Sequence, residues 1–424
     1  MLQGSLADEA SQAVPDDRDA ILPEESVVLI VEDDPRFASV LLTLVRDSGF
    51  KGVVTGEGAA VPGLARRFGP DAIMLDIGLP DMDGLALLDL LKHTPETSHI
   101  PVHVISADDQ RGLGLAMGAI GFTRKPVERE TVVSTLQTMK SFVDDSDRRI
   151  ALVGAAGEAA SVLEDCFGAV TIGPALGPLL AREPGIAAVV IEASAAPVSQ
   201  TLDELRQQAN GFAPALVYTP GELDPEDERR LRLGVFAGLV RLARNPDQLV
   251  EQVSLLLHEP LTRMSDAAKA TLARSRRLDQ ILAGRKVLVI DDDIRNIFSL
   301  ASALEEYGIE LLYAESGRLG LDLLDAKGDV DLILVDIMMP DMDGYETIRA
   351  IRGREAFEAT PVIAVTAKAM KGDRQKCIQA GASDYVAKPV AIDHLVSVLR
   401  VSLQRADARR LTGDALTGMA LQPG

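Results

Sequence analysis

Short, almost wholly apolar runs alternate with amphipathic stretches along most of the chain. Residues 27–31, 72–75 and 102–105 are such runs, and residues 37–46 place their apolar side chains at helical spacing. A run that is apolar at every position is typical of a strand buried on both faces of a parallel sheet, whereas apolar positions three and four residues apart are typical of a helix. The alternation predicts an α/β protein with open, doubly wound parallel sheets.

The same pattern occurs twice, with the same polar residues in the same order at near-equal spacing. In the first copy the polar residues at the strand ends are Glu32, Asp33, Asp76, Ser106 and Lys125, and in the second they are Asp291, Asp292, Asp336, Thr366 and Lys388. Each lysine is followed by a proline. A purely structural cluster of acidic residues would not explain why an acidic pair, an aspartate, a hydroxyl residue and a Lys-Pro pair occur in the same order in both copies.

A third, weaker copy lies between these two. Residues 149–153 and 186–191 match its first and third strands, and residues 213–219 and 238–241 match the fourth and fifth. We expect Gly154 and Ala155 at the acidic-pair positions, Glu192 at the Asp position, Thr219 at the hydroxyl position and Arg241 in place of the lysine. The middle copy therefore retains the strand pattern and lacks the acidic pair.

These blocks predict the organisation of the chain. We expect a disordered lead over residues 1–25, a first domain over 26–143, a degenerate domain over 149–257, a helical linker over 258–284, a third domain over 285–403 and a flexible tail over 404–424. In the linker, Leu261, Met264, Ala268 and Leu272 would lie on one side of a helix that starts near a solvated His258 and stops at Gly284.

Composition narrows the class of protein. The 424 residues are 47% hydrophobic and 25% charged, which is typical of a soluble globular protein. Lys plus Arg number 43 against 64 Asp plus Glu, and the net charge of −21 opposes nonspecific binding to nucleic acid. Cys166 and Cys377 are far apart, which argues against a disulfide framework or a thiolate zinc site. No signal-peptide pattern or long apolar run is present, so we expect a cytoplasmic protein without membrane insertion.

The polar residues at the strand ends suit one kind of chemistry. The carboxyl ends of parallel strands meet at one edge of a sheet, so each set is expected to share a pocket. Two carboxylates facing a third make a hard-oxygen site that suits Mg²⁺. A metal there would offset the repulsion between the third carboxylate and an incoming phosphoryl group, and that carboxylate can form an acyl phosphate. A hydroxyl and a lysine can bind the phosphoryl oxygens.

Both outer copies resemble receiver domains, the response-regulator fold of two-component signalling. The resemblance is close over residues 26–143 and 285–403 and weak over 149–257, and it implies a flavodoxin-like (βα)5 fold for all three domains. It implies phosphoacceptors at Asp76 and Asp336, Mg²⁺ held by Glu32 and Asp33 with Asp76 and by Asp291 and Asp292 with Asp336, switch hydroxyls at Ser106 and Thr366, phosphoryl-binding lysines at Lys125 and Lys388, and rotating switch aromatics at Phe122 and Tyr385. The order of three such domains resembles the C-terminal part of large hybrid histidine kinases.

Some residues have more than one interpretation. The middle domain is interpreted as a pseudo-receiver, since without the acidic pair little remains there to hold Mg²⁺. Its Glu192 is either a permanent substitute for a phosphorylated Asp or a relic of a degenerate site. Phe122 and Tyr385 are either switch residues or ordinary core aromatics.

The sequence hypothesis is a multi-receiver signalling protein. Its partners would be a histidine kinase or histidine phosphotransferase and a downstream protein, and no separate catalytic domain is expected. Alternatives are the C-terminal receiver region of a hybrid kinase and a docking scaffold that is not phosphorylated. A phosphatase of the haloacid dehalogenase class would need a second Asp where Gly78 and Met338 stand.

Overall fold

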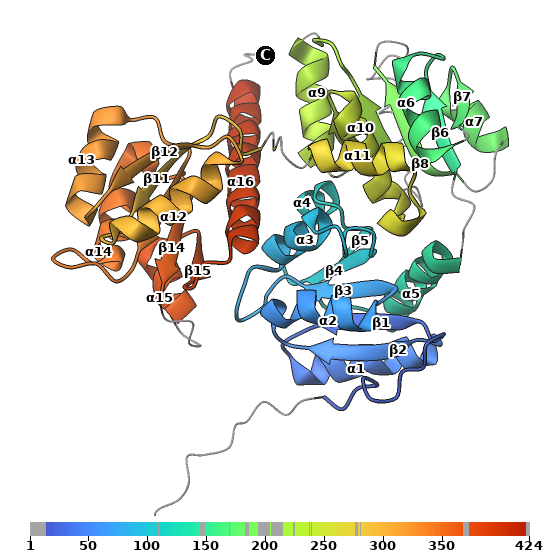
Figure 1. The fold of residues 1–424 in the computed structure, drawn as a ribbon, viewed down its shortest axis with the longest axis horizontal. Helices are drawn as coiled ribbons and strands as arrows, with labels where there is room; N and C mark the ends of the chain where they lie inside the picture. The colour runs from blue at the N-terminus through green and yellow to red at the C-terminus, as the bar shows by residue number, and fades with distance from the viewer. Residues whose placement is uncertain are drawn as a thin grey trace, which may run out of the picture.

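The computed structural model describes residues 14–420 except 109, 145–148, 169, 183–185, 194–203, 205–214, 224, 237, 239, 276–278, 280 and 368–372. It contains three five-stranded parallel sheets, one in each domain (Figure 1). The strand orders are β2-β1-β3-β4-β5, β10-β9-β8-β6-β7 and β12-β11-β13-β14-β15, which are the same flavodoxin-like order in all three. The predicted fold class is therefore confirmed.

The first domain alternates strands and helices as the apolar pattern predicts. Its elements are β1 (Val27–Val31), α1 (Pro35–Asp47), β2 (Lys51–Thr55), the short 3-10 helix η1 (Gly58–Ala60), α2 (Val61–Phe68), β3 (Ala72–Asp76), α3 (Gly84–His93), β4 (Val102–Ser106), α4 (Arg111–Ala116), β5 (Gly121–Arg124) and α5 (Arg129–Asp144). Every residue of β1, β3 and β4 is buried. These three strands form the centre of the sheet, which explains why their sequences do not alternate between apolar and polar residues.

The third domain repeats this arrangement and ends in a long helix. Its elements are β11 (Lys286–Ile290), α12 (Ile294–Glu305), β12 (Glu310–Ala314), α13 (Gly317–Lys327), β13 (Leu332–Asp336), α14 (Gly344–Arg352), the 3-10 helix η3 (Glu355–Phe357), β14 (Val362–Thr366), α15 (Asp373–Ala380), β15 (Asp384–Ala387) and α16 (Ile392–Ala420). The predicted flexible tail is wrong as far as Ala420, because α16 continues through residues 404–420 as one helix.

The middle domain has the same strand order. Its elements are β6 (Arg149–Val153), α6 (Glu158–Phe167), β7 (Val170–Gly173), α7 (Leu176–Arg182), β8 (Ile186–Glu192), β9 (Ala215–Tyr218), α9 (Pro225–Phe236), β10 (Val240–Ala243), α10 (Pro246–Leu257), the 3-10 helix η2 (Leu261–Arg263) and α11 (Asp266–Ser275). Its core consists of apolar side chains on both faces of this sheet.

The single helix predicted over residues 258–284 is wrong. Helix α10 ends at His258, which adopts a left-handed conformation with φ of 48° and is buried rather than solvated. Pro260 follows, and the chain reverses before α11 begins. The apolar face was nevertheless correctly located, since Met264, Ala268 and Leu272 are buried against α6 and α10. The segment through α11 thus belongs to the core of the middle domain.

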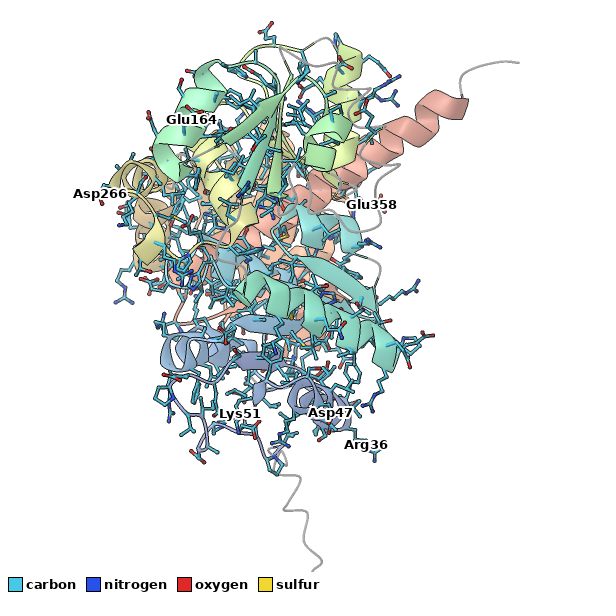
Figure 2. The ribbon with its side chains drawn as sticks, turned by 90° about the vertical axis from the view of Figure 1, so that its right-hand side faces the viewer. Arg36, Asp47, Lys51, Glu164, Asp266 and Glu358 are labelled. Carbon is cyan, nitrogen blue, oxygen red and sulfur yellow. The ribbon has the colours of Figure 1, made fainter. Side chains whose placement is uncertain are left out.

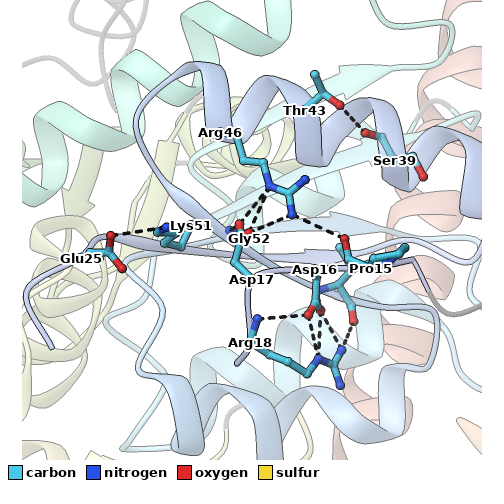
Figure 3. Close-up of polar contacts among 11 residues, drawn as sticks. Pro15, Asp16, Asp17, Arg18, Glu25, Ser39, Thr43, Arg46, Lys51 and Gly52 are labelled. Carbon is cyan, nitrogen blue, oxygen red and sulfur yellow. Dashed lines mark hydrogen bonds and ion pairs between the residues drawn. The ribbon is translucent and has the colours of Figure 1, made fainter. Parts of the chain in front are cut away.

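Part of the predicted disordered lead is bound to the first domain. Asp16 accepts a hydrogen bond from the backbone N–H of Val54 at 2.8 Å, and Asp17 accepts one from Gly52 at 2.9 Å (Figure 3). Arg46 of α1 pairs with Asp17 at 2.8 Å. The two aspartates satisfy backbone donors of the edge strand β2 and cover that edge. The predicted disorder is therefore wrong for residues 16–18.

Helices far apart in the sequence pack together between the first and third domains. Helix α16 lies beside α3 (Figure 1), and apolar residues of both helices, such as Leu88 and Leu399, belong to one continuous buried cluster. At the centre of this contact Arg400 pairs with Asp89 at 2.9 Å, with the Arg400 side chain 7% exposed and that of Asp89 3% exposed. Arg400 also pairs with Asp279. The first and third domains therefore share a core.

Many other charged side chains lie on the outer faces of the domains. Arg36 and Asp47 of α1 and Glu164 of α6 point into solvent (Figure 2). Among the helices that the structure describes, none combines the length and apolarity that a membrane-spanning helix needs.

Replacement of Arg400 by Met should destabilise the packed first and third domains by about 3 kcal/mol, because it leaves Asp89 and Asp279 buried without their guanidinium. Urea unfolding measures this change. Arg129→Ala removes an exposed pair with Asp47 and serves as the control, for which we expect no measurable change. Equal midpoints for Arg400→Met and the wild type would contradict the structural role of the pair.

Candidate functional site

In the first domain, the ends of three strands bring the predicted polar residues together. Lys125, directly after β5, donates to Asp76 Oδ2 at 2.8 Å and to Glu32 Oε1 and Oε2 at 3.0 and 2.8 Å. Asp76 ends β3 and Glu32 follows β1, and both are buried. Asp33 is exposed beside them. Ligand oxygens of Glu32, Asp33 and Asp76 lie within 4.8 Å of one another.

Burial shapes the electrostatics of this pocket. Burial, with the neighbouring Asp76 charge, raises the pKa of Glu32 to about 7, although Lys125 acts in the opposite direction. Burial disfavours the charge of Lys125, but its hydrogen bonds to Asp76 and Glu32 outweigh that effect and raise its pKa. One ammonium group thus stabilises two closely spaced carboxyl groups in a partly desolvated site, and a divalent cation would relieve the remaining repulsion.

The third domain builds the same pocket with an additional polar partner. Lys388 donates to Asp336 at 2.8 Å and to Asp291 at 2.9 Å. Asn296, in the first turn of α12, donates to both carboxylate oxygens of Asp291 at 3.1 and 3.2 Å. Ligand oxygens of Asp291, the exposed Asp292 and Asp336 again lie within 4.8 Å of one another.

Sequence reasoning missed the residue at the Asn296 position. It lies five residues after the first buried acid, where the first domain has Phe37. The Phe37 ring lies 4.8 Å from the Lys125 ammonium, at cation–π distance. The two pockets therefore also differ at this position, which contacts the acid in one and the lysine in the other. Its fixed distance of five residues from the first acid was the feature of the sequence that could have identified this position.

Backbone geometry fixes the orientation of each central aspartate. The N–H groups of Gly78 and Met338, two residues after each Asp, donate to Asp76 and Asp336 at 3.2 Å. A Cβ at Gly84 would meet the carbonyl oxygen of Asp76 at 2.5 Å, so only glycine allows α3 to begin so close to the end of β3. Gly344 has the same role before α14, with a distance of 2.3 Å.

The predicted hydroxyl residues lie at the same edge. Ser106 ends β4 and Thr366 ends β14, and both are almost fully buried. Ser106 Oγ accepts a hydrogen bond from the N–H of Asp108 at 3.1 Å. Each hydroxyl is therefore on the strand next to the one that ends in the central aspartate.

The carboxylate sets fit Mg²⁺ by their chemistry. All the ligand atoms are hard oxygens, and an exposed acid beside two buried ones leaves room for the waters that Mg²⁺ retains. Glu32, Asp33 and Asp76 would hold one ion, and Asp291, Asp292 and Asp336 another. Within the described parts of the middle domain no comparable cluster occurs.

In the middle domain, Glu192 and Thr219 lie at the positions that the sequence predicted for them. Glu192 ends β8 and pairs in register with Tyr218, as Asp76 pairs with Ile105, so Glu192 holds the Asp position. Thr219 follows β9 at the hydroxyl position and donates to the carbonyl of Gly221 at 3.1 Å.

The prediction that Arg241 replaces the lysine is wrong. Arg241 pairs in register with Leu216, well before the end of β10. Because Tyr218 pairs with Ala243, the position that corresponds to Lys125 is Asn245. Asn245 accepts a hydrogen bond from Gln248 at 2.9 Å and caps α10. The sequence prediction aligned the middle domain with the first by the apolar run of β10 alone, which shifted the alignment. Aligning Asn245-Pro246 with the Lys-Pro pair of the first domain would have given the correct position.

The aromatic residues three positions before each lysine have different surroundings. Phe122 on β5 is half-buried against the core of the first domain. Tyr385 on β15 is 6% exposed, and its hydroxyl donates to the backbone carbonyl of Asp81 at 2.7 Å. Asp81 belongs to the loop that follows β3, so this hydrogen bond joins the third domain to the loop after Asp76 in the first.

Arg405 of the third domain makes two further contacts with loops of the first domain. Arg405 of α16 pairs with Asp83 at 2.8 Å and donates to Gln110 at 2.8 Å. Asp384, next to Tyr385, is almost fully buried, and burial together with the nearby Asp83 charge raises its pKa to about 7. Two carboxyl groups from different domains thus meet beside one arginine.

These features define a class of protein. The family model of the response regulator receiver domain matches residues 28–137 and 287–400, more than half of the chain, and the chain belongs to that family. Such receiver domains occur in two-component signalling proteins, both response regulators and hybrid histidine kinases.

Individual relatives match only part of the chain. Histidine kinase 3 of Arabidopsis thaliana is 33% identical over an alignment of 138 residues, and the match covers 28% of this chain and 13% of that protein. The transcriptional regulatory protein CpxR of Escherichia coli K12 is 38% identical over 121 residues, which are 28% of this chain and 50% of that protein. The chain thus spans at most half the length of either relative.

Solved structures give similar matches. The receiver domain of the sensor histidine kinase PA1611 from Pseudomonas aeruginosa, described with a magnesium ion in its active-site cleft, has 32% sequence identity. The match covers 29% of this chain and 99% of that structure, with a TM-score of 0.26.

The raised pKa of Asp384 predicts a pH dependence of stability. The folded protein keeps a proton on Asp384 up to about pH 7, whereas the unfolded chain releases it near the ordinary value of 3.8. The free energy of unfolding should therefore fall as the pH rises between these values. In Asp384→Asn this fall should be smaller, as measured by urea unfolding at pH 5 and pH 7.5.

Asp329→Asn, at an exposed carboxylate of the same domain, is the control and should keep the wild-type pH dependence. An Asp384→Asn variant with an unchanged pH dependence would show that this buried carboxyl group does not titrate as described.

Proposed function

We propose that the chain is a multi-receiver signalling protein in which Asp76 and Asp336 accept phosphoryl groups from a phosphohistidine of a histidine kinase or histidine phosphotransferase. The observation that supports this most strongly is the twofold occurrence of one pocket, in which a lysine bridges a buried central aspartate and a second buried acid. The signal then passes to partners through phosphorylation-dependent changes of conformation.

The pocket residues suit this reaction. An oxygen of Asp76 attacks phosphorus, an O–P bond forms, the P–N bond breaks, and its electron pair returns to the imidazole of the donor. Lys125 and the Gly78 N–H hold the attacking carboxylate in place. The Ser106 hydroxyl and the Lys125 ammonium then pair with phosphoryl oxygens. Bound Mg²⁺ supplies charge neutralisation between the carboxylates and the phosphoryl group. Lys388 and Thr366 take these roles at Asp336.

The middle domain is proposed to act as a pseudo-receiver. Gly154 and Ala155 stand at the positions of the acidic pair, and Asn245 replaces the lysine. Glu192 has a longer side chain than Asp and a different reach into the pocket. With neither metal ligands nor a bridging ammonium, this edge lacks the groups that support an acyl phosphate, so its contribution is structural.

The surface beside Asp336 suits a protein phosphodonor. Phe298 of α12 is 64% exposed, Ile294 is 41% exposed and Met338 is 58% exposed. Exposed large apolar side chains close to a reactive group are typical of a contact surface. The beginning of α12 also carries Asn296, which contacts Asp291 in the Asp336 pocket, so a helical partner lying there would present its phosphohistidine to this aspartate.

Intact-protein mass spectrometry tests the phosphoacceptor assignment. After incubation with acetyl phosphate and Mg²⁺, the wild type should gain two phosphoryl groups. Asp76→Asn and Asp336→Asn should each gain one, and the double variant none, because each acyl phosphate needs its own carboxylate. EDTA should abolish both additions. Glu192→Gln is the matched control and should still gain two.

Additions that persist in the double variant would contradict the assignment. No addition to the wild type, from acetyl phosphate or from a phosphorylated histidine phosphotransferase, would favour a docking scaffold that is not phosphorylated.

Phe298→Ala should slow phosphoryl transfer to Asp336 from a phosphorylated histidine phosphotransferase by about tenfold, since it removes a large apolar contact. The same variant should react with acetyl phosphate at the wild-type rate, because the small donor does not use this surface. Leu319→Ala, at a similarly exposed residue of α13, is the control. Equal slowing with both donors would indicate damage to the pocket instead of loss of a docking contact.

A further inference from the structure

A large cavity lies where the three domains meet. Its volume is about 650 Å³, within the range of small-molecule sites, and its wall combines residues of α3, of β10 and α10, and of α16. Leu90 and His93 come from the first domain, Arg241 and Gln252 from the second, and Ser397 from the third. No phosphoacceptor pocket contributes to this wall, so the cavity is distinct from both.

The most unusual group on the wall is Arg241. Arg241 is 4% exposed, and among the described residues its side chain makes one hydrogen bond, a long one of 3.3 Å to Gln252 Oε1. Within the part of the chain that the structure describes, its Nε has no hydrogen-bond partner, and no carboxylate forms an ion pair with the guanidinium. A buried guanidinium without an anion is costly, and burial lowers the pKa of Arg241 to about 10.

A second buried cation lies next to it. Lys92 is 3% exposed, and its ammonium donates to the backbone carbonyls of Ser98 and Ile100 at 3.1 and 2.6 Å. Burial and the nearby Arg241 charge lower the pKa of Lys92 to about 7. The lowered pKa shows that no carboxylate of the described residues offsets the charge of Arg241 at Lys92 and that the two basic groups disfavour each other's charge.

Helix α16 presents unpartnered polar atoms to the same cavity. Ser397 Oγ and Gln404 Oε1 are buried and form no hydrogen bond, and both residues line the wall. Glu96, Glu251 and Asp393 also lie on the wall, so it offers acceptors as well as donors. Buried polar atoms are normally satisfied, and several unsatisfied ones around one cavity point to a missing polar occupant.

We propose that this cavity binds a small organic oxyanion that carries hydroxyl or amino groups, with its phosphate or carboxylate at Arg241 and its donor groups toward α16. The guanidinium fork matches either oxyanion. Apolar side chains such as Leu90 and Val396 line the remaining surface and would contact the carbon skeleton. Since the occupant would touch all three domains, it would favour their packed arrangement. This site is independent of phosphorylation.

Thermal unfolding with two probes tests the proposal. AMP supplies a phosphate and citrate supplies carboxylates. Each probe is added at 10 mM to a buffer that contains EDTA, and NaCl keeps the ionic strength constant. At least one probe should raise the Tm of the wild type by about 2 °C or more. Asp76→Asn/Asp336→Asn should show the same rise, because the phosphoacceptor pockets do not take part.

Arg241→Gln should abolish the rise, and its Tm without a probe should equal or exceed that of the wild type, since Arg241 has only one weak partner. Arg244→Gln removes the same charge three residues away, from a surface pair with Glu228, and should keep the rise. Ser397→Ala, which loses an unpartnered hydroxyl, should reduce it.

Hydrogen–deuterium exchange locates the effect. The effective probe should slow exchange in peptides that cover residues 241–252 and 393–404 of the wild type. No rise with either probe, or an equal rise in Arg241→Gln, would overturn the proposal. Protection confined to the two carboxylate clusters would also overturn it and assign the binding to the phosphoacceptor pockets.

Discussion

Each receiver site depends on one ammonium group placed between two buried carboxylates. Without Lys125, the carboxylates of Glu32 and Asp76 would face each other at the edge of the sheet with only backbone donors to stabilise them. The lysine is itself positioned by the end of β5, so the strand order of the sheet and the charge balance of the site are linked. A doubly wound sheet provides this link, because all its parallel strands end at the same edge.

The sequence predicted the fold and the members of the two sites because both rest on local signals. A run such as residues 27–31 is apolar at every position because the strand is covered on both faces. Asp76 is the last residue of β3 and Lys125 comes directly after β5, so the ends of the apolar runs located both residues. Arg241 was misplaced because it is the one polar residue within the short strand β10 and was matched to the lysine, whereas the residue at that position is Asn245, just after the strand. One continuous helix over residues 258–284 was predicted because the apolar spacing of Leu261, Met264, Ala268 and Leu272 continues across the boundary between η2 and α11.

The contact between the first and third domains left a weaker trace in the sequence. Helix α3 reads GLALLDLLKH and is buried almost all round, whereas α14, its counterpart, reads GYETIRAIR and has one apolar face. A helix that is apolar on every side must be covered by more than its own sheet. That comparison indicates a partner for α3, but not which of the other helices it is. The Tyr385 hydrogen bond to a backbone carbonyl has no sequence signature at all.

The pairing of α3 with α16 has a consequence for the order of events during synthesis. Helix α3 ends at His93, and α16 begins at Ile392. At about 5–20 residues per second, roughly 15 to 60 seconds of translation separate the two helices. During that interval the leucines of α3 that α16 later covers face solvent on a growing chain that has already formed its first sheet. The nascent protein therefore carries a temporary apolar surface, and its last helix closes it.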